Sequence, residues 1–202
     1  KIYFNYNYRY SLLGEILDKK KKFKLGNLLS GNIYSTHGLA SKSNYRSSWR
    51  SNKLHCPKGI FEIVTIHMID LLNYYLDIKK INKINLKNIS RVGNSFDTVN
   101  VKLTMKNNAE INIFNSYFAP YFVKWNLVFE NGIIELDDKN IIIRGPRNSF
   151  DKDRNFILPK IIKKIAISHS KDYQNSLINS INFFLSRVKK NKSFSKQGFL
   201  KS

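Results

Sequence analysis

Alternating apolar and polar side chains between residues 81 and 143 constrain the fold of this chain more than any other feature. Over residues 99–106 the two kinds alternate without a miss, as in a strand with one face in a core. Asn131-Gly132 is a strong hairpin turn, since both residues tolerate a positive φ. Further strands are predicted over residues 111–113, 121–130, 133–136 and 141–143. Consecutive strands with short turns predict an antiparallel sheet.

Three helices are predicted around these strands. The first begins near Ser11, runs into four consecutive lysines and ends at Gly26. The central helix, over residues 60–76, is strongly apolar, and the last, over residues 172–188, has the apolar spacing of an amphipathic helix. The remaining segments are predicted as strands (residues 2–9 and 27–36), a long loop (38–58) and irregular chain (147–170). Helices before and after a sheet cover one of its faces, so the order predicts an α+β fold: an open, mainly antiparallel sheet with helices packed on one face.

The length of 202 residues fits one domain. We assign it to residues 1–188 and expect the basic tail, residues 189–202, to be frayed. The sequence opens on Lys1 without an initiator Met and directly in a strand-like segment. We therefore expect an internal piece of a longer protein.

The formal net charge is +21, which invites a nucleic-acid interpretation. The excess is mostly Lys, however, and it accompanies abundant Asn and Ile, which share A/T-rich codons with Lys. Arg, the residue suited to bidentate recognition of phosphate and guanine, is scarce. We expect no nucleic acid as a partner; a nucleic-acid binder would need residues 19–24, 79–80 and 189–196 on one face.

Cys56 is the single cysteine, which rules out an internal disulfide framework and favours a reducing, cytoplasmic setting. No apolar run reaches the roughly 18 residues of a membrane span, so no membrane contact is expected. The pattern H-E-x-x-H is absent and no His, Asp or Glu cluster has metal-ligand spacing, so we expect no metal. The phosphate-cradling patterns G-x-G-x-x-G and G-x-x-x-x-G-K-[ST] are absent as well.

His67 and Asp70 are set into the apolar helix three residues apart, which places them on one face. A buried imidazole costs free energy unless it has a partner or a function. Two interpretations stay open: a core histidine bonded to Asp70 or to a backbone carbonyl, or a general acid or base at the mouth of a cleft. The long loop with Trp49 and Arg50 ends where this helix begins, which favours a cleft there. Asp70 is expected to support the site.

Five further residues are candidate substrate contacts. Arg9, His37 and Arg50 suit anionic groups of a small substrate, with ordinary surface charge as the alternative. Tyr8 and Trp49 suit stacking on a sugar or ring, with edge or interface packing as the alternative.

Six segments in order resemble the C-terminal domain of the Gfo/Idh/MocA oxidoreductases, the family of glucose-fructose oxidoreductase and inositol dehydrogenase. They are F-N-Y-N-Y-R (4–9), L-G-N (25–27), T-H-G-L-A with S-S-W-R (36–50), G-I-F-E-I-V-T-I-H-M-I-D-L-L (59–72), F-E-N-G-I-I-E-L-D-D (129–138) and D-Y-Q-N-S-L-I-N-S-I-N-F-F-L (172–185). The resemblance implies an open sheet of the dihydrodipicolinate-reductase-like type. It also implies NAD or NADP, bound mainly by an N-terminal Rossmann domain that is absent from this chain.

The resemblance implies that His67 transfers a proton to or from a substrate hydroxyl during hydride transfer. Family members often carry an Asp four residues before this His, where this chain has Ile63. The predicted function is the substrate-binding and catalytic half of an NAD(P)-dependent oxidoreductase acting on a sugar, sugar nucleotide or cyclic polyol, with a homo-oligomer formed through the exposed sheet face. The alternatives are a non-catalytic scaffold or partner that retains the fold and, less favoured, a basic nucleic-acid-binding domain.

Overall fold

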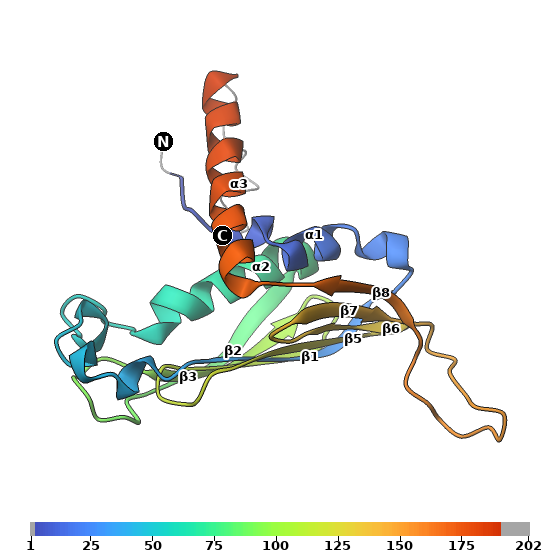
Figure 1. Ribbon diagram of the computed structural model, residues 1–202, viewed down its shortest axis with the longest axis horizontal. Coiled ribbons are helices and arrows are strands. Elements are labelled where there is room, and N and C mark those ends of the chain that lie inside the picture. The colour runs from blue at the N-terminus through green and yellow to red at the C-terminus, as the bar shows by residue number, and fades with distance from the viewer. Residues whose placement is uncertain (1–2, 191–202) are drawn as a thin grey trace.

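A computed structural model of the chain describes residues 3–190 and shows one eight-stranded sheet in the order β2-β3-β4-β1-β5-β6-β7-β8 (Figure 1). Strands β1 and β4 pair in parallel, and all other neighbours pair antiparallel, which confirms the open, mainly antiparallel sheet. The strands are β1 (Leu28–Thr36), β2 (Ile78–Lys87), β3 (Thr98–Met105), β4 (Glu110–Ser116), β5 (Phe122–Phe129), β6 (Gly132–Leu136), β7 (Asn140–Arg144) and β8 (Ile161–Ala166).

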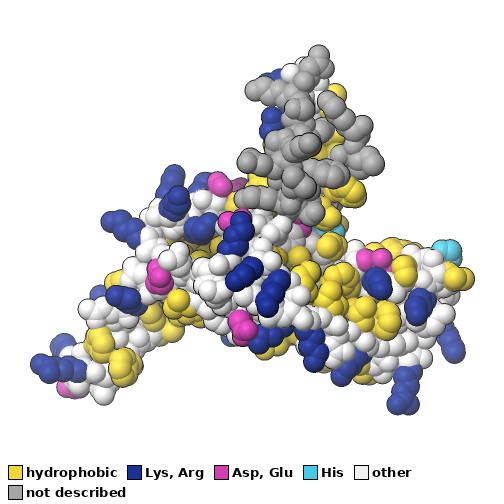
Figure 2. All heavy atoms as spheres, turned by 180° about the vertical axis from the view of Figure 1, so that it is seen from behind, with side chains coloured by type: hydrophobic (Ala, Val, Ile, Leu, Met, Phe, Trp, Pro, Cys, Tyr) yellow, Lys and Arg dark blue, Asp and Glu magenta, His cyan; other side chains and the backbone are white. Residues whose placement is uncertain are grey.

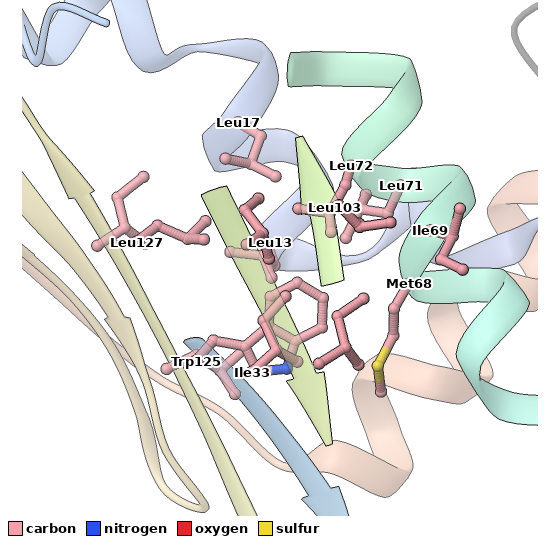
Figure 3. Close-up of a cluster of buried hydrophobic side chains, with 14 of the residues drawn as sticks. Leu13, Leu17, Ile33, Met68, Ile69, Leu71, Leu72, Leu103, Trp125 and Leu127 are labelled. Atoms are coloured by element: carbon pink, nitrogen blue, oxygen red, sulfur yellow. The ribbon is translucent and has the colours of Figure 1, made fainter. Parts of the chain in front are cut away.

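The alternation of the sequence determines which face of the sheet is inside. In β3 and β5 the apolar residues at every second position are buried and their neighbours are more exposed. Helices α1 (Leu12–Asp18) and α2 (Ile66–Leu76) lie over that inner face, and the opposite face is uncovered (Figure 1). Leu13 and Leu17 of α1 and Leu71 and Leu72 of α2 are buried together with side chains of the sheet, as Figure 3 shows for Ile33, Leu103, Trp125 and Leu127. Burying each such aliphatic side chain contributes about 1.5–3 kcal/mol.

Three segments near the ends of the chain differ from the sequence prediction. Residues 2–9 were predicted as a strand, but a 3₁₀ helix, η1 (Asn7–Tyr10), occupies the end of this segment. The first helix stops at Asp18, and a separate 3₁₀ turn (Lys20–Phe23) carries most of the lysines. The segment predicted as irregular contains β8, an edge strand with most of its residues exposed. Its two exposed faces give no alternation for a sequence pattern to detect.

The central helix begins with one π-helical turn, Phe61–Thr65, before α2. Gly59 precedes that turn with a φ of +56°, and a Cβ on it would lie 1.8 Å from the carbonyl oxygen of Phe96. A glycine is therefore required where the loop turns into the helix. Single π-helical turns are frequent at functional sites, and this one lies directly before His67.

Helix α3 (His169–Lys189) stands away from the rest of the molecule and contacts the N-terminal segment at its base (Figure 1). The Asn7 amide donates a hydrogen bond of 2.7 Å to the Ser176 hydroxyl, and the Tyr3 and Ser180 hydroxyls lie 2.8 Å apart. These contacts hold α3 against η1 and the residues that precede it. The predicted basic tail begins at the last turn of α3, and residues 191–202 lie outside the described residues.

Within residues 3–190, no helix is both long and apolar enough to cross a membrane. The same range contains no group of three or more His, Cys, Asp or Glu residues arranged to hold a metal ion. Lys and Arg side chains are spread over the face visible in Figure 2, with hydrophobic side chains gathered beside the base of α3.

Candidate functional site

A cavity of about 360 Å³ lies between the π-helical turn, the loop after β1 and the base of α3. It brings together four of the predicted site residues, His67, His37, Arg50 and Tyr8. Its remaining wall is formed by residues not singled out as site residues from the sequence: Leu39, Ile63, Val64, Tyr117 and Tyr173. Segments far apart in the chain therefore meet at one concave site, which is the usual location of a binding or catalytic centre.

His67 contributes an imidazole that is partly buried in the wall of this cavity. Its ring packs against those of Tyr8 and Tyr6, with centroids 5.3 and 6.0 Å away. The Nδ1 atom is buried and has no hydrogen-bond partner in the described part of the chain. Burial lowers the pKa of His67 below its usual value of 6.5, so the imidazole is neutral near pH 7 and able to accept a proton.

Asp70 lies on the same helix but serves a different neighbour. The Arg9 guanidinium donates two hydrogen bonds to its carboxylate, one of 2.6 Å from Nε to Oδ2 and a shorter one from Nη2 to Oδ1. The sequence placed Asp70 beside the imidazole of His67, and the structure gives its carboxylate to Arg9 instead. Positions three apart on a helix are separated by about 60° around its axis, enough to face different partners. Asp70 thus binds η1 through Arg9, the residue next to Tyr8.

Arg9 is a structural cation in this arrangement and does not line the cavity. Its guanidinium lies 4.5 Å from the ring centroid of Tyr74 and 5.5 Å from that of Tyr6. Burial raises the pKa of Asp70, and the bond and charge of Arg9 act in the opposite direction. The contact predicted between Arg9 and a substrate is therefore replaced by a buried ion pair.

His37 follows the last residue of β1 and lines the cavity opposite His67. Its backbone N–H donates to the Ser116 carbonyl at 3.0 Å, which holds the loop against the end of β4. Its ring centroid lies 5.0 Å from that of Tyr117. Burial lowers the pKa of His37, with a smaller contribution in the same direction from the positive charge of Arg50. Both imidazoles of the cavity are therefore neutral near pH 7.

Arg50 brings the positive charge of the site. Its guanidinium lies 4.4 Å from the ring centroid of Trp49, a cation–π contact that fixes its position. Trp49 is 45% exposed and does not line the cavity. The structure places Trp49 as the support of Arg50, and Arg50 as the residue that reaches the cavity.

The tyrosines add neutral hydrogen-bonding groups. Burial raises the pKa of Tyr8 to about 12 and also raises the pKa of Tyr117, so both phenols keep their protons. Tyr117 directly follows β4, at the end of that strand to which His37 is hydrogen-bonded. Loop residues next to a strand end often belong to binding sites, so the predicted strand is a signal that could have indicated Tyr117. Tyr173 reaches the cavity because α3 docks on η1, which no local pattern reveals.

No carboxylate lines this cavity within the described residues. The position four residues before His67 is occupied by Ile63, which forms part of the wall. The neighbouring acid, Glu62, accepts a hydrogen bond of 2.9 Å from the backbone N–H of Lys58 and caps the start of the helix instead. Among the described residues, no carboxylate from the helix of His67 therefore lines the cavity beside the imidazole.

Several solved structures share this fold. The chain matches levoglucosan dehydrogenase in complex with NADH and levoglucosan with a TM-score of 0.74 at 15% identity, covering 94% of this chain and 57% of that one. An Agrobacterium radiobacter oxidoreductase in complex with NAD⁺, L-tartaric acid and magnesium matches with 0.70 at 16%, covering 94% and 55%. A Thermotoga maritima oxidoreductase matches with 0.72 at 15%, covering 96% and 53%. The chain thus spans little more than half the length of each.

A search of the curated proteins finds no match. The family model described as the GFO/IDH/MocA C-terminal domain matches residues 20–135, more than half of the chain. The matched range includes His37, Arg50 and His67. The chain therefore belongs to the GFO/IDH/MocA family, through the C-terminal domain that the family model describes.

Proposed function

We propose that the chain is the substrate-binding and catalytic half of an NAD(P)-dependent oxidoreductase acting on a sugar, a sugar nucleotide or a cyclic polyol. The observation that carries this proposal is the neutral imidazole of His67 in the wall of a cavity that also contains His37, Arg50 and tyrosines. Structural neighbours bound to NADH with levoglucosan, and to NAD⁺ with tartaric acid, support the substrate class.

The residues that line the cavity fit the nicotinamide end of the cofactor and do not fit its pyrophosphate. The sequence has no glycine-rich phosphate loop, and Arg50 is the one cation among the described residues that line the cavity. Rings and neutral polar groups suit an uncharged carboxamide or polyol, whereas a pyrophosphate needs a cradle of backbone N–H groups. We assign the pyrophosphate to a Rossmann domain outside this chain. When bound, the cofactor supplies the hydride acceptor or donor.

The protein groups then carry the proton chemistry. In the oxidative direction, His67 accepts the proton of the substrate hydroxyl while the carbon that bears this hydroxyl gives up a hydride. In the reverse direction, His67 returns the proton to the oxygen. The phenols of Tyr8 and Tyr117 remain protonated and donate hydrogen bonds to substrate oxygens. Arg50 stabilises negative charge on the substrate, either a developing alkoxide or an anionic substituent.

The test is turnover of the complete oxidoreductase with His67→Ala. We expect kcat to fall by about 10² or more, because a positioned general base contributes that much, while the thermal unfolding midpoint stays close to that of the parent. His55→Ala, an exposed histidine outside the cavity, is the matched control and should retain full turnover. Equal kcat values for the His67→Ala variant and the parent would refute the role of His67.

A second candidate, a non-catalytic scaffold or partner that retains the fold, is favoured by one observation: Ile63 occupies the position where family members often have an Asp. Such a protein would keep substrate or partner binding without hydride transfer. Turnover of the complete protein without substitutions separates the two proposals. An oxidoreductase reduces the cofactor in the presence of its polyol, whereas a scaffold does not reduce it with any polyol.

The proposal includes a homo-oligomer formed through the uncovered sheet face. Tyr34 on this face lies 6.4 Å from the ring of Phe114 and 5.8 Å from that of Phe122. Exposed aromatic clusters of this kind mark interaction surfaces. Sedimentation velocity of the Tyr34→Glu variant and of the unsubstituted protein tests this interface, and we expect the variant to lose the oligomer.

We also place the protein in the reducing cytoplasm, since Cys56 is a free, buried thiol.

A further inference from the structure

A second cavity of about 360 Å³ lies directly behind the first, between the inner face of the sheet and the base of α3. Tyr8, His37 and Tyr173 line both cavities, so the two adjoin at these three residues. The chemistry described above uses the first cavity and leaves the second without a function.

The walls of this second cavity are mainly apolar. Trp125 and Leu136 from the sheet and Met68 from α2 line it, and each is 5% exposed or less. Val123 of β5 and Ile167, which follows β8, complete the apolar part. The half-exposed side chains of Tyr121 and Tyr173 also line this cavity, so it can be reached from solvent, and an apolar group placed against its buried walls is removed from water.

Three of the polar side chains that line this cavity have hydrogen-bond partners within the chain. The Ser176 hydroxyl donates to the Tyr173 carbonyl at 2.7 Å, and His169 Nε2 lies 3.1 Å from the Asp137 carbonyl. Asp172 Oδ1 accepts a 3.0 Å hydrogen bond from the backbone N–H of Leu12. An apolar occupant therefore displaces no hydrogen bond of these groups and leaves none of these atoms unpaired.

The size of the cavity limits the occupant. Liquid water takes about 30 Å³ per molecule, so the volume corresponds to roughly a dozen atoms of that size. A phenyl ring or a short alkyl chain fits this space. A second sugar ring gains less from this space, because its hydroxyls would lose water against the apolar side chains of Met68, Trp125 and Leu136.

We propose that the substrate is a polyol bearing an aryl or short alkyl substituent, with the polyol beside His67 and the substituent passing between Tyr8, His37 and Tyr173 into the second cavity. This inference rests on the proposed function, since it takes the first cavity as the polyol site. It narrows the substrate class from sugars in general to glycosides and similar conjugates with an apolar group.

The experiment measures dissociation constants for this chain by ligand-observed NMR with three kinds of probe. These are methyl glycosides of glucose, galactose and mannose, the matching phenyl glycosides, and benzyl alcohol. We expect the phenyl glycoside of the preferred sugar to bind about tenfold or more tightly than its methyl counterpart, since added apolar contacts in a hydrophobic pocket give discrimination of this order. Benzyl alcohol should bind as well.

Val123→Phe and Ile167→Phe are each designed to fill the second cavity. Two such variants are used so that one remains for the test if the other folds poorly. Either one should reduce the affinity of the phenyl glycoside to that of the methyl glycoside and abolish binding of benzyl alcohol. The control is Val188→Phe on the exposed end of α3, the same chemical change far along the helix from the cavity, which should keep the advantage of the phenyl group.

The outcomes separate this inference from the function on which it rests. The inference is overturned if methyl and phenyl glycosides bind with equal affinity. It is also overturned if the phenyl glycoside binds more tightly and both filling variants keep this difference in affinity. Either result leaves the proposed function standing. Binding of benzyl alcohol without binding of any glycoside overturns the polyol site itself, and the composite substrate with it.

Discussion

The His67 side and the Asp70 side of α2 differ more than their separation of three residues would indicate. On the Asp70 side two polar groups have partners: Arg9 donates hydrogen bonds to the Asp70 carboxylate, and the Tyr75 hydroxyl donates a 3.0 Å hydrogen bond to the Arg9 carbonyl. On the His67 side Nδ1 has no hydrogen-bond partner among residues 3–190, and the ring lines a cavity. A polar group that stabilises the fold is fully paired, whereas one that serves a ligand retains unused capacity.

The segment that separates the two sides is η1. Its neighbouring residues Tyr8 and Arg9 serve opposite purposes, since Tyr8 packs on the imidazole and lines the cavity while Arg9 neutralises Asp70. One short turn therefore anchors the helix and shapes the site. Predictions of stability, of pH dependence and of catalysis follow separately for the two sides.

The largest effect on stability is expected from Asp70→Ala. This variant leaves the Arg9 guanidinium in a site where its side chain is 14% exposed and that of Asp70 is 3% exposed. Breaking a buried ion pair by removing one partner costs about 3–5 kcal/mol, which urea unfolding measures as a lower transition midpoint. Lys102→Ala breaks the exposed pair with Glu110 and should cost about 1 kcal/mol or less. Equal losses for the two variants would remove the distinction between the two sides.

His67→Leu should change the free energy of unfolding far less, by about 1 kcal/mol or less. Leucine removes a buried nitrogen that has no hydrogen-bond partner in the part of the chain that the structure describes, and its apolar volume keeps contact with the rings of Tyr8 and Tyr6. Urea unfolding again provides the measurement. A loss as large as that of Asp70→Ala would show that the imidazole has a structural partner and that His67 belongs to the stabilising side.

The smallest effect is a pH dependence of stability on the His67 side. Burial lowers the pKa of His67 and His37 in the folded protein, so below pH 6.5 the unfolded chain binds more protons than the folded one. The free energy of unfolding should therefore fall as the pH drops from 6.5 through the folded pKa values. Comparing urea unfolding of the parent with that of the double variant His37→Gln, His67→Gln should show a weaker decline in the variant. Identical pH profiles would contradict the lowered pKa values.

The sheet could be predicted from the sequence because half-buried strands alternate, as residues 99–105 of β3 do. Strand β8 was missed because it lies at the edge with most of its residues exposed, and η1 was mistaken for a strand because its shape depends on contacts with α2 and α3. Local patterns carry no information on such contacts.

In the candidate site, too, some residues could be predicted from local sequence patterns and others depend on tertiary packing. His67, His37 and Arg50 stood out because polar groups in an apolar helix or a long loop are conspicuous, and the cavity brings them together. The partner of Asp70 could not be read from the sequence, since Arg9 lies 61 positions away. The role of Trp49 as the support of Arg50 and the presence of Tyr173 also depend on tertiary packing.

The role of His67 as the proton acceptor is tested most directly by the pH dependence of kcat/KM for the complete oxidoreductase and its His67→Gln variant. In the oxidative direction we expect activity of the parent to fall on the acid side with a pKa below 6.5, because a protonated imidazole accepts no proton. This acid limb should be absent from the residual activity of the variant. An acid limb of the same pKa in both proteins would show that another group carries the proton.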